Sequence, residues 1–178
     1  QQIQTWPSDD KQNSRQGLKV SEKREMLAEK KKSEKRRTQT TSPGAVPSQG
    51  QINRLLEHYQ YGKFADAEKL AASLTQQSPS HPFAWKVMGA VLKQTGRLNE
   101  SLLPVQKSVE LSPNDAEAHY NLGNTLKELG KLDEAEASYK QAIALKPDLA
   151  EAHFNLGITQ QELNRLEDSE TSYKQAIA

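Results

Sequence analysis

The sequence of 178 residues contains no cysteine. Disulfide bonds, thiolate metal ligands and thiol nucleophiles are therefore excluded. Long apolar runs are missing as well. No stretch approaches the roughly 18 apolar residues that a membrane-spanning helix requires, so a membrane is not an expected partner. The lack of cysteine is compatible with a reducing compartment, and we expect a cytoplasmic location.

Aromatic residues make up only 6% of the chain, and apolar residues 34%. This apolar share is low for a globule with one deep core, and it suits an elongated structure or a folded part joined to a disordered one. Residues 1–47 hold 11 Lys and Arg against 6 Asp and Glu, a net charge of +5. Residues 48–178 hold 13 against 17, a net charge of −4. The two parts therefore differ in character.

Residues 1–47 carry few large apolar side chains and end in a linker rich in Ser, Thr, Pro and Gly, which predicts a disordered, basic extension. Basic residues cluster from Lys30 to Arg37, a pattern also found in nucleic-acid-binding segments and nuclear addresses. No aromatic side chain is interleaved there to stack on bases, and four glutamates dilute the charge: Glu22, Glu25, Glu29 and Glu34. The pattern favours a solvated tether over nucleic-acid binding.

Residues 48–178 repeat with a period of 34. Three sets of residues recur at this spacing: Gly89, Gly123 and Gly157; Gly62, Gly96 and Gly130; and Pro79, Pro113 and Pro147. They divide this part into the units 48–81, 82–115, 116–149 and 150–178. The last unit is about five residues short and the chain begins with Gln1, so we expect the natural chain to continue past Ala178 and its N-terminus to be processed or cut.

Each unit predicts two antiparallel helices. A Gly, or Asn164 in the last unit, would end the first helix in the left-handed conformation. The capping-box spacing predicts N-caps at Asn114, with Glu117, and at Asp148, with Glu151. The second helices would be capped by Asn99 and Asp133.

Small residues are predicted to let the two helices of a unit approach closely. Gly123 and Gly157 would face Ala135 and Ser169, and a larger side chain would overpack the contact at a cost of about 1–3 kcal/mol. The predicted structural positions of the repeats are Gly89, Gly96, Gly123, Gly130, Ala135 and Gly157.

These units resemble the tetratricopeptide repeat (TPR). The resemblance rests on an aromatic near the start, Leu-Gly three places later, Gly before the second helix, a small residue early in that helix, Tyr then Ala late in it, and Pro near the end. In the third unit these features, from Leu-Gly onward, are Leu122-Gly123, Gly130, Ala135, Tyr139, Ala142 and Pro147. The resemblance covers about 130 residues. It implies an all-α, right-handed superhelical solenoid of antiparallel helix-turn-helix repeats. The first unit departs from the pattern with Arg54-Leu55 in place of Leu-Gly, which fits a polar end unit.

No catalytic constellation is visible. The four histidines are not at metal-ligand spacing within a helix, and His119 and His153 recur with the repeat, which indicates packing residues. No glycine loop has phosphate-binding spacing. We therefore expect no catalytic residue, no metal and no cofactor in this segment, and no enzyme activity of its own.

The resemblance implies a concave groove, lined by the first helices, that binds a peptide or helix of a partner protein. The inward-facing residues predicted to bind it are Lys86, Lys93, Asn121, Asn124, Lys127, Asn155 and Gln161, with Ala90 and Ile158 between them. The leading hypothesis is thus a protein–protein interaction scaffold. The alternative is a substrate-recruiting region of a larger enzyme, for example a protein O-linked N-acetylglucosamine transferase, whose catalytic domain would follow residue 178.

Two known uses of such grooves can be compared with these residues. A carboxylate clamp for acidic tails would suit Lys86 and Asn121, but Glu117, Glu151 and Asn155 stand where basic residues are needed, which argues against it. An asparagine ladder, as in the transferases named above, would use Asn53, Asn121 and Asn155 to bond the peptide backbone, because an amide offers one donor and one acceptor group to each peptide unit.

Overall fold

The computed structural model describes residue 29 and residues 46–177. Its contacts divide the chain into two parts, Gln1–Ser42 and Pro43–Ala178. The predicted disordered extension over 1–47 and the basic cluster from Lys30 to Arg37 lie almost wholly outside the described residues. Within the second part, Pro43–Ala178, the chain forms α2 (Gln49–Gln60), α3 (Phe64–Gln77), α4 (Pro82–Gln94), α5 (Leu98–Leu111), α6 (Ala116–Glu128), α7 (Leu132–Leu145), α8 (Ala150–Glu162) and α9 (Leu166–Ala176).

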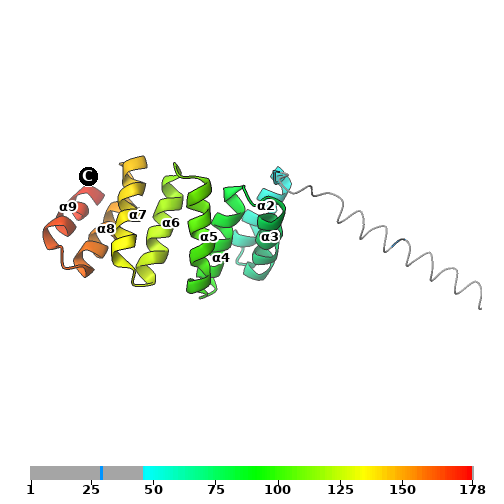
Figure 1. Ribbon diagram of the computed structural model, residues 1–178, viewed down its shortest axis with the longest axis horizontal. Helices are drawn as coiled ribbons and strands as arrows, with labels where there is room; N and C mark the ends of the chain where they lie inside the picture. Colours follow the sequence, from blue (N-terminus) through cyan, green and yellow to red (C-terminus); the bar gives the residue numbers. More distant parts are fainter. Residues whose placement is uncertain (1–28, 30–45, 178) are drawn as a thin grey trace, which may run out of the picture. The chain divides into compact units, whose positions relative to one another are not determined.

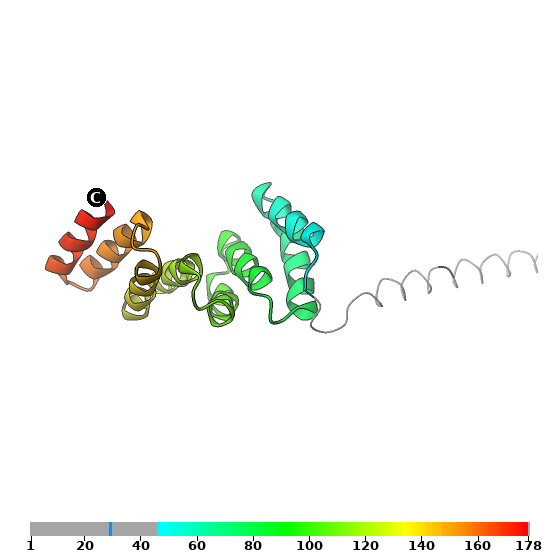
Figure 2. The ribbon, with the colours of Figure 1, turned by 90° about the horizontal axis from the view of Figure 1, so that it is seen from above.

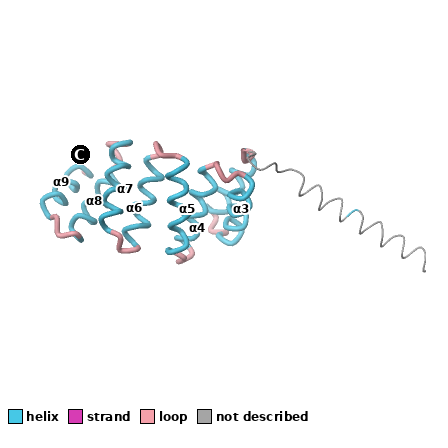
Figure 3. Tube along the Cα trace, in the orientation of Figure 1, coloured by secondary structure: helices cyan, strands magenta, loops and turns pink. Residues whose placement is uncertain are grey.

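The eight helices form four antiparallel pairs, and consecutive pairs pack side by side in sequence order (Figures 1 and 2). Only short loops separate the helices, and the part of the chain that the structure describes contains no strand (Figure 3). The prediction of an all-helical array of paired helices is confirmed. Each of the four sequence units contains one pair, and we number the units accordingly, from unit 1 (α2–α3) to unit 4 (α8–α9).

The turn inside each unit ends the first helix as the sequence predicts. Gly96 has φ of 77° and Gly130 of 72°, and Asn164 takes the same place with φ of 60°. After α4, the amide of Arg97 donates to the Leu92 carbonyl at 2.9 Å, and the amide of Gly96 donates to the Lys93 carbonyl at 3.0 Å. This is the Schellman arrangement, which satisfies carbonyls that the helix leaves free.

The predicted N-caps are wrong. The cap of α6 is Asp115 rather than Asn114, and its Oδ1 accepts from the amides of Glu117 and Ala118 at 2.9 and 3.2 Å. At α8 the cap is Leu149, which offers no side-chain bond. The second helices α5 and α7 begin before Asn99 and Asp133. Their N-cap residues are Arg97 and Lys131, whose side chains make no capping hydrogen bond. For α5 and α7 the cause is the left-handed glycine, because the second helix restarts almost at once after it and leaves no room for a cap at the predicted positions.

The close contact within each pair involves a different side chain from the predicted one. A Cβ added at Gly123 would lie 2.6 Å from Cε1 of Tyr139, and one added at Gly157 would lie 2.7 Å from Cε1 of Tyr173. The nearest atoms are therefore those of a tyrosine four residues beyond the predicted Ala135 and Ser169. Ser169 still takes part, because its hydroxyl donates to the Gly157 carbonyl at 2.8 Å.

The core is shared between neighbouring units. One buried cluster joins α2, α3 and α4 through residues that include Leu55, Leu74 and Val91, and another joins α6, α7 and α8 through Leu126, Tyr139 and Leu156. No unit buries its apolar face alone, so each depends on its neighbours for stability, as expected for a repeat array.

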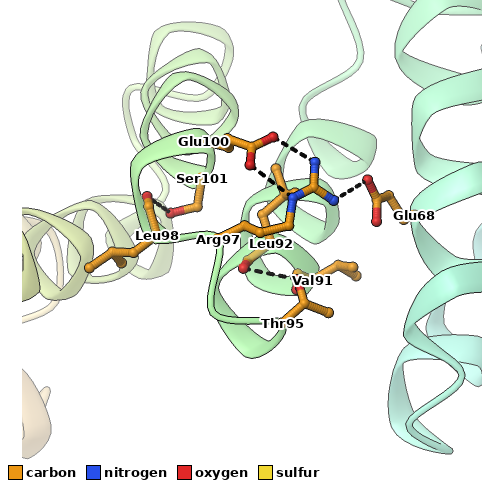
Figure 4. Close-up of polar contacts among 8 residues, drawn as sticks. All are labelled: Glu68, Val91, Leu92, Thr95, Arg97, Leu98, Glu100 and Ser101. Atoms are coloured by element: carbon orange, nitrogen blue, oxygen red, sulfur yellow. Dashed lines mark hydrogen bonds and ion pairs between the residues drawn. The ribbon is translucent and has the colours of Figure 1, made fainter.

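Arginines at the turn between the two helices of a unit also connect the units. Figure 4 shows the Arg97 guanidinium between Glu100, one turn further along α5, and Glu68 of α3, with N–O distances of 2.6–2.9 Å. Two units later, Arg165 contacts Glu136 of α7 in the same register as Arg97 contacts Glu68, and it also contacts Asp133 of α7. The Glu136 side chain is buried, and Lys140 and Gln160 also contact it.

Replacing Gly123 by Ala tests the close approach of α6 and α7. The added Cβ would overlap the ring of the fully buried Tyr139, so we expect a loss of about 1–3 kcal/mol in the free energy of unfolding. Gly50→Ala is the matched control, because nothing lies within 4 Å of a Cβ at that helical position and alanine favours helix. Urea titration of both variants checks this, and equal stabilities would contradict it.

Glu136→Gln tests the ion contact between units 3 and 4. Burial raises the pKa of Glu136, but Lys140, Gln160 and Arg165 outweigh it and hold the pKa below the ordinary value of 4.5. A lowered carboxyl pKa stabilises the fold above pH 4.5, and this stabilisation is lost as the pH falls through the folded-state value. We expect the variant to be about 1–2 kcal/mol less stable at pH 7, with the difference from wild type vanishing in acid.

The matched control is Asp133→Asn, which removes the exposed partner of the same arginine and should change stability by less than about 1 kcal/mol. Thermal unfolding between pH 3 and 7 measures both variants. A Glu136→Gln difference that stays constant over this range would contradict the assignment.

Candidate functional site

The seven polar residues predicted to bind a partner all lie on first helices of the pairs, α4, α6 and α8. We call the surface that they share the first-helix face; it consists of Lys86, Lys93, Asn121, Asn124, Lys127, Asn155 and Gln161. Most of these side chains contact one another or a neighbouring unit, so they also contribute to the fold.

Lys86 connects α4 to the start of α6. Its Nζ lies 3.0 Å from Oδ2 of Asp115 and 2.7 Å from Oε2 of Glu117. Burial lowers the pKa of Lys86, but the hydrogen bonds and negative charges of Glu117 and Asp115 outweigh it and raise the pKa above its ordinary value. The lysine therefore stays charged at neutral pH, and its charge is already matched by two carboxylates.

The other two lysines are also paired. Nζ of Lys93 lies 2.6 Å from Oε1 of Glu128 on α6, and Nζ of Lys127 donates to Oδ1 of Asn155 on α8 at 3.3 Å. Each lysine thus bridges one first helix to the next. The charge of Lys93 is matched by a carboxylate, whereas Lys127 bonds a neutral amide.

A hydrogen-bond network joins units 3 and 4 around Asn155. Its Nδ2 donates to the Tyr120 hydroxyl at 3.0 Å and to Oδ1 of Asn124 at 3.1 Å. The same Asn124 oxygen accepts from the Tyr139 hydroxyl at 2.8 Å. With Lys127 on its oxygen, the Asn155 amide has both its donor and its acceptor group occupied within the protein.

Asn121 and Gln161 differ in what they contact. Oε1 of Gln161 accepts from the Tyr173 hydroxyl at 3.1 Å. The half-buried Asn121 side chain makes no hydrogen bond to another described residue; only its backbone carbonyl is used, by Thr125 at 3.0 Å. Among the seven, Asn121 is therefore the side chain that makes no hydrogen bond to another described residue, so both ends of its amide are available for a ligand.

A cavity of about 140 Å³ lies beside Asn121, between α4, α5 and α6. Lys86, Ala90, Lys93 and Asn121, all of them predicted groove residues, line it. It has further walls that the sequence analysis missed: Tyr59 of α2 and Gly89, Val105 and Ser108. A comparison of the units at the 34-residue period could have indicated Val105, because tyrosine stands at its position in units 3 and 4.

The aromatic position at the start of each unit has a structural role. The ring nitrogens of Trp85, His119 and His153 contact the carbonyls of Pro79, Pro113 and Pro147 at 2.8, 2.8 and 2.9 Å. Each contact closes the turn between two units with the same bond. His119 and His153 are predicted to serve packing, and the structure gives both of them this hydrogen bond at the turn.

Across residues 29 and 46–177, no three His, Asp or Glu side chains gather closely enough to hold a metal ion. None of the helices described here is long and apolar enough to cross a membrane. Among the features of this region that could receive a ligand are the polar groups and the cavity of the first-helix face.

Comparisons with known proteins agree with this architecture. A TPR repeat model matches residues 123–164, and a tetratricopeptide repeat model matches residues 105–137. A search of curated proteins returns no match.

Among solved structures, a double mutant of MamA RS-1 is 19% identical with a TM-score of 0.69, and the match covers 79% of this chain and 76% of that one. MamA from Desulfovibrio magneticus RS-1, from residue 41 to its end, is 20% identical with a TM-score of 0.66, covering 71% and 72%. MamA MSR-1 is 21% identical with a TM-score of 0.63, covering 71% and 72%.

The paired helices, the 34-residue period and the left-handed turn residues define a helical repeat array. Residues 105–164 of it match TPR repeat models, and its fold is like that of MamA. The comparisons do not show a particular similarity to O-linked N-acetylglucosamine transferases.

Asn155→Ala tests the network between units 3 and 4. The change removes the partner of Tyr120, Asn124 and Lys127, and we expect a loss of about 1–2 kcal/mol in unfolding free energy. Asn121→Ala is the matched control, since it gains the same helix propensity but breaks no side-chain bond, and its stability should stay within about 0.5 kcal/mol. Chemical denaturation measures both; an equal effect at the two positions would contradict the network.

Proposed function

We propose that this chain is a protein–protein interaction scaffold that binds an extended segment of a partner on its first-helix face. TPR repeats typically bind proteins, and the array is of this kind. The observation that carries the proposal is the cavity of about 140 Å³ beside Asn121, whose side-chain amide has no partner among the described residues. A concave site with a few convergent polar groups is the usual form of a binding site.

The charges around this site favour an uncharged segment. Lys86 and Lys93 are already paired with Asp115, Glu117 and Glu128. An acidic tail would therefore have to displace carboxylates of the protein that are already in place. The carboxylate clamp is thus disfavoured on the contacts as well as on the sequence. A segment that inserts a mostly apolar side chain and bonds through its backbone suits the site better.

Of the three asparagines predicted to form a ladder, Asn121 is the one whose side chain is free to bind a peptide backbone. The Asn155 amide is committed to Tyr120, Asn124 and Lys127, and the exposed Asn53 accepts from Nε2 of Gln49 at 2.8 Å. The free amide of Asn121 can both donate to a peptide carbonyl and accept from a peptide amide. In this proposal Asn121 positions the backbone of the bound segment.

The alternative role, a substrate-recruiting region of a larger glycosyltransferase, stays a prediction, as does the cytoplasmic location. No contact described above favours that enzyme over a scaffold without catalytic activity. The scaffold is the simpler proposal, because it needs only the surface that the described residues provide.

The proposal is tested by selecting displayed random peptides on the whole chain and measuring their affinities by isothermal titration. We expect Asn121→Ala to weaken the selected peptides about 3- to 10-fold, the value of one or two net hydrogen bonds. Asn99→Ala is the matched control, since Asn99 is an exposed asparagine on the second helix α5 and should bind as wild type does. Peptides that bind both variants equally well would show that the site lies elsewhere.

A further inference from the structure

The two helices of each unit meet at one pair of positions, and these pairs are filled unequally. Unit 1 places the buried Leu55 opposite the small Ala71. Units 3 and 4 place Gly123 and Gly157 opposite Tyr139 and Tyr173. A large residue thus stands opposite a small one in three units, as close packing requires.

Unit 2 breaks this rule because both of its residues are small. Gly89 stands opposite Val105, whose Cγ2 would lie 2.4 Å from a Cβ at Gly89. Val105 therefore reaches the glycine as the tyrosine rings do, but its side chain ends there. The space that the rest of a tyrosine would take is left over in this unit.

The tyrosines of the other units show where that space lies. The Tyr139 hydroxyl reaches Asn124, and the Tyr173 hydroxyl reaches Gln161. In unit 2 the residues at these two positions of the period are Ala90 and Lys93. Both line the cavity of about 140 Å³, together with Gly89 and Val105. The cavity is therefore the unfilled tyrosine position of unit 2.

A second observation marks this cavity as a site for a polar ligand group. The Ser108 hydroxyl lines it, the residue is only 2% exposed, and Oγ has no hydrogen-bond partner. Buried hydroxyls are normally bonded, and leaving one unpaired costs free energy. Units 3 and 4 carry Ala142 and Ala176 at this position of the period, so the hydroxyl belongs to the unit that has the cavity.

We infer that this cavity is an anchor pocket for a tyrosine side chain of the bound segment, which would occupy the place that Tyr139 and Tyr173 occupy in their own units. The inference rests on the proposed function, since the tyrosine arrives on a partner. A cavity of about 150 Å³ is known to hold a benzene ring, so the size is suitable. The ring would pack on Gly89, Ala90 and Val105 but point in the opposite direction, because it enters from the first-helix face. Its hydroxyl would therefore bond the buried Ser108 and not point toward Ala90 and Lys93.

The surroundings distinguish tyrosine from other anchors. Phenylalanine would leave the Ser108 hydroxyl unpaired, at the cost of a buried unsatisfied group. An acidic side chain would meet three carboxylates already bound to Lys86 and Lys93. A phenol is apolar along its ring and polar at its tip, which matches the walls and the single buried hydroxyl.

The pocket can be tested with p-cresol, the side chain of tyrosine, added to the whole chain and followed through the methyl signals of Ala90 and Ala118 by NMR. We expect saturable binding with a dissociation constant on the order of 1 mM. Val105→Tyr fills the cavity with the chain's own tyrosine and should weaken binding by at least about tenfold. Leu103→Tyr is the matched control, because it adds the same side chain at an exposed position of α5 and should leave binding unchanged.

A second variant keeps the test decisive if Val105→Tyr does not fold. Ser108→Ala adopts the residue that units 3 and 4 already carry. Wild type should bind p-cresol more tightly than toluene by about 3- to 10-fold, and Ser108→Ala should lose this preference. No saturable p-cresol signal in wild type, as for a cavity that holds only water, would overturn the inference. So would binding that neither variant changes.

Selected peptides separate this inference from the proposed function. We expect them to contain a tyrosine whose replacement by Ala costs about tenfold or more in affinity, and Val105→Tyr should produce the same loss. Peptides that depend on Asn121 but not on a tyrosine or on Val105 would leave the function standing and overturn the pocket. If p-cresol binds as expected and no peptide binds, the proposed function is overturned and the preference of the cavity for a phenol stands.

Discussion

The two helices of every unit approach each other so closely that the residues at their contact must be matched in size. In units 3 and 4 a glycine lies against a tyrosine ring, at a distance that no other residue could tolerate without displacement. This contact sets the separation of the two helices, and the tyrosine that it admits is part of the core shared with the next unit. The stacking of units therefore depends on a constraint inside each of them.

The same constraint explains why most residues of the first-helix face have structural contacts. The Tyr139 ring passes between its helices and carries a hydroxyl to Asn124, on that face. Asn155 and Lys127 then continue the chain of bonds to the next unit. Polar side chains at repeat-periodic positions thus hold neighbouring first helices together. Side chains that would be exposed in an isolated unit form hydrogen bonds with the next unit of the array.

A repeat makes exceptions informative, because each unit is a control for the others. Unit 2 keeps the glycine, the left-handed turn and the helix lengths of unit 3, yet it has Val105 where units 3 and 4 have tyrosine and Ser108 where they have alanine. The backbone is held by the units on both sides, so it does not collapse to fill the gap. A rigid frame with one missing side chain is how a small cavity persists in an array that is otherwise closely packed.

The sequence by itself determined the helix pairs and their turns, because those depend on residues close together in the chain. A glycine at Gly96 or Gly130 can take a positive φ and the residues around it bond locally, so the end of each first helix could be predicted. The list of polar residues on the first helices followed from the 34-residue period in the same way. The N-caps were wrong even so, since a shift of one or two residues decides them.

Only the tertiary structure decided which side chains meet. Tyr139 rather than Ala135 lies against Gly123. Lys86 pairs with carboxylates 29 and 31 residues further along the chain, and the side-chain amide of Asn155 donates to two residues of α6. Such pairings depend on the distance and rotation between packed helices, which no local pattern carries. The cavity beside Asn121 could not be predicted for the same physical reason. Its volume is the space between the packed helices that their side chains do not fill, and that space is known only once the helices are in place.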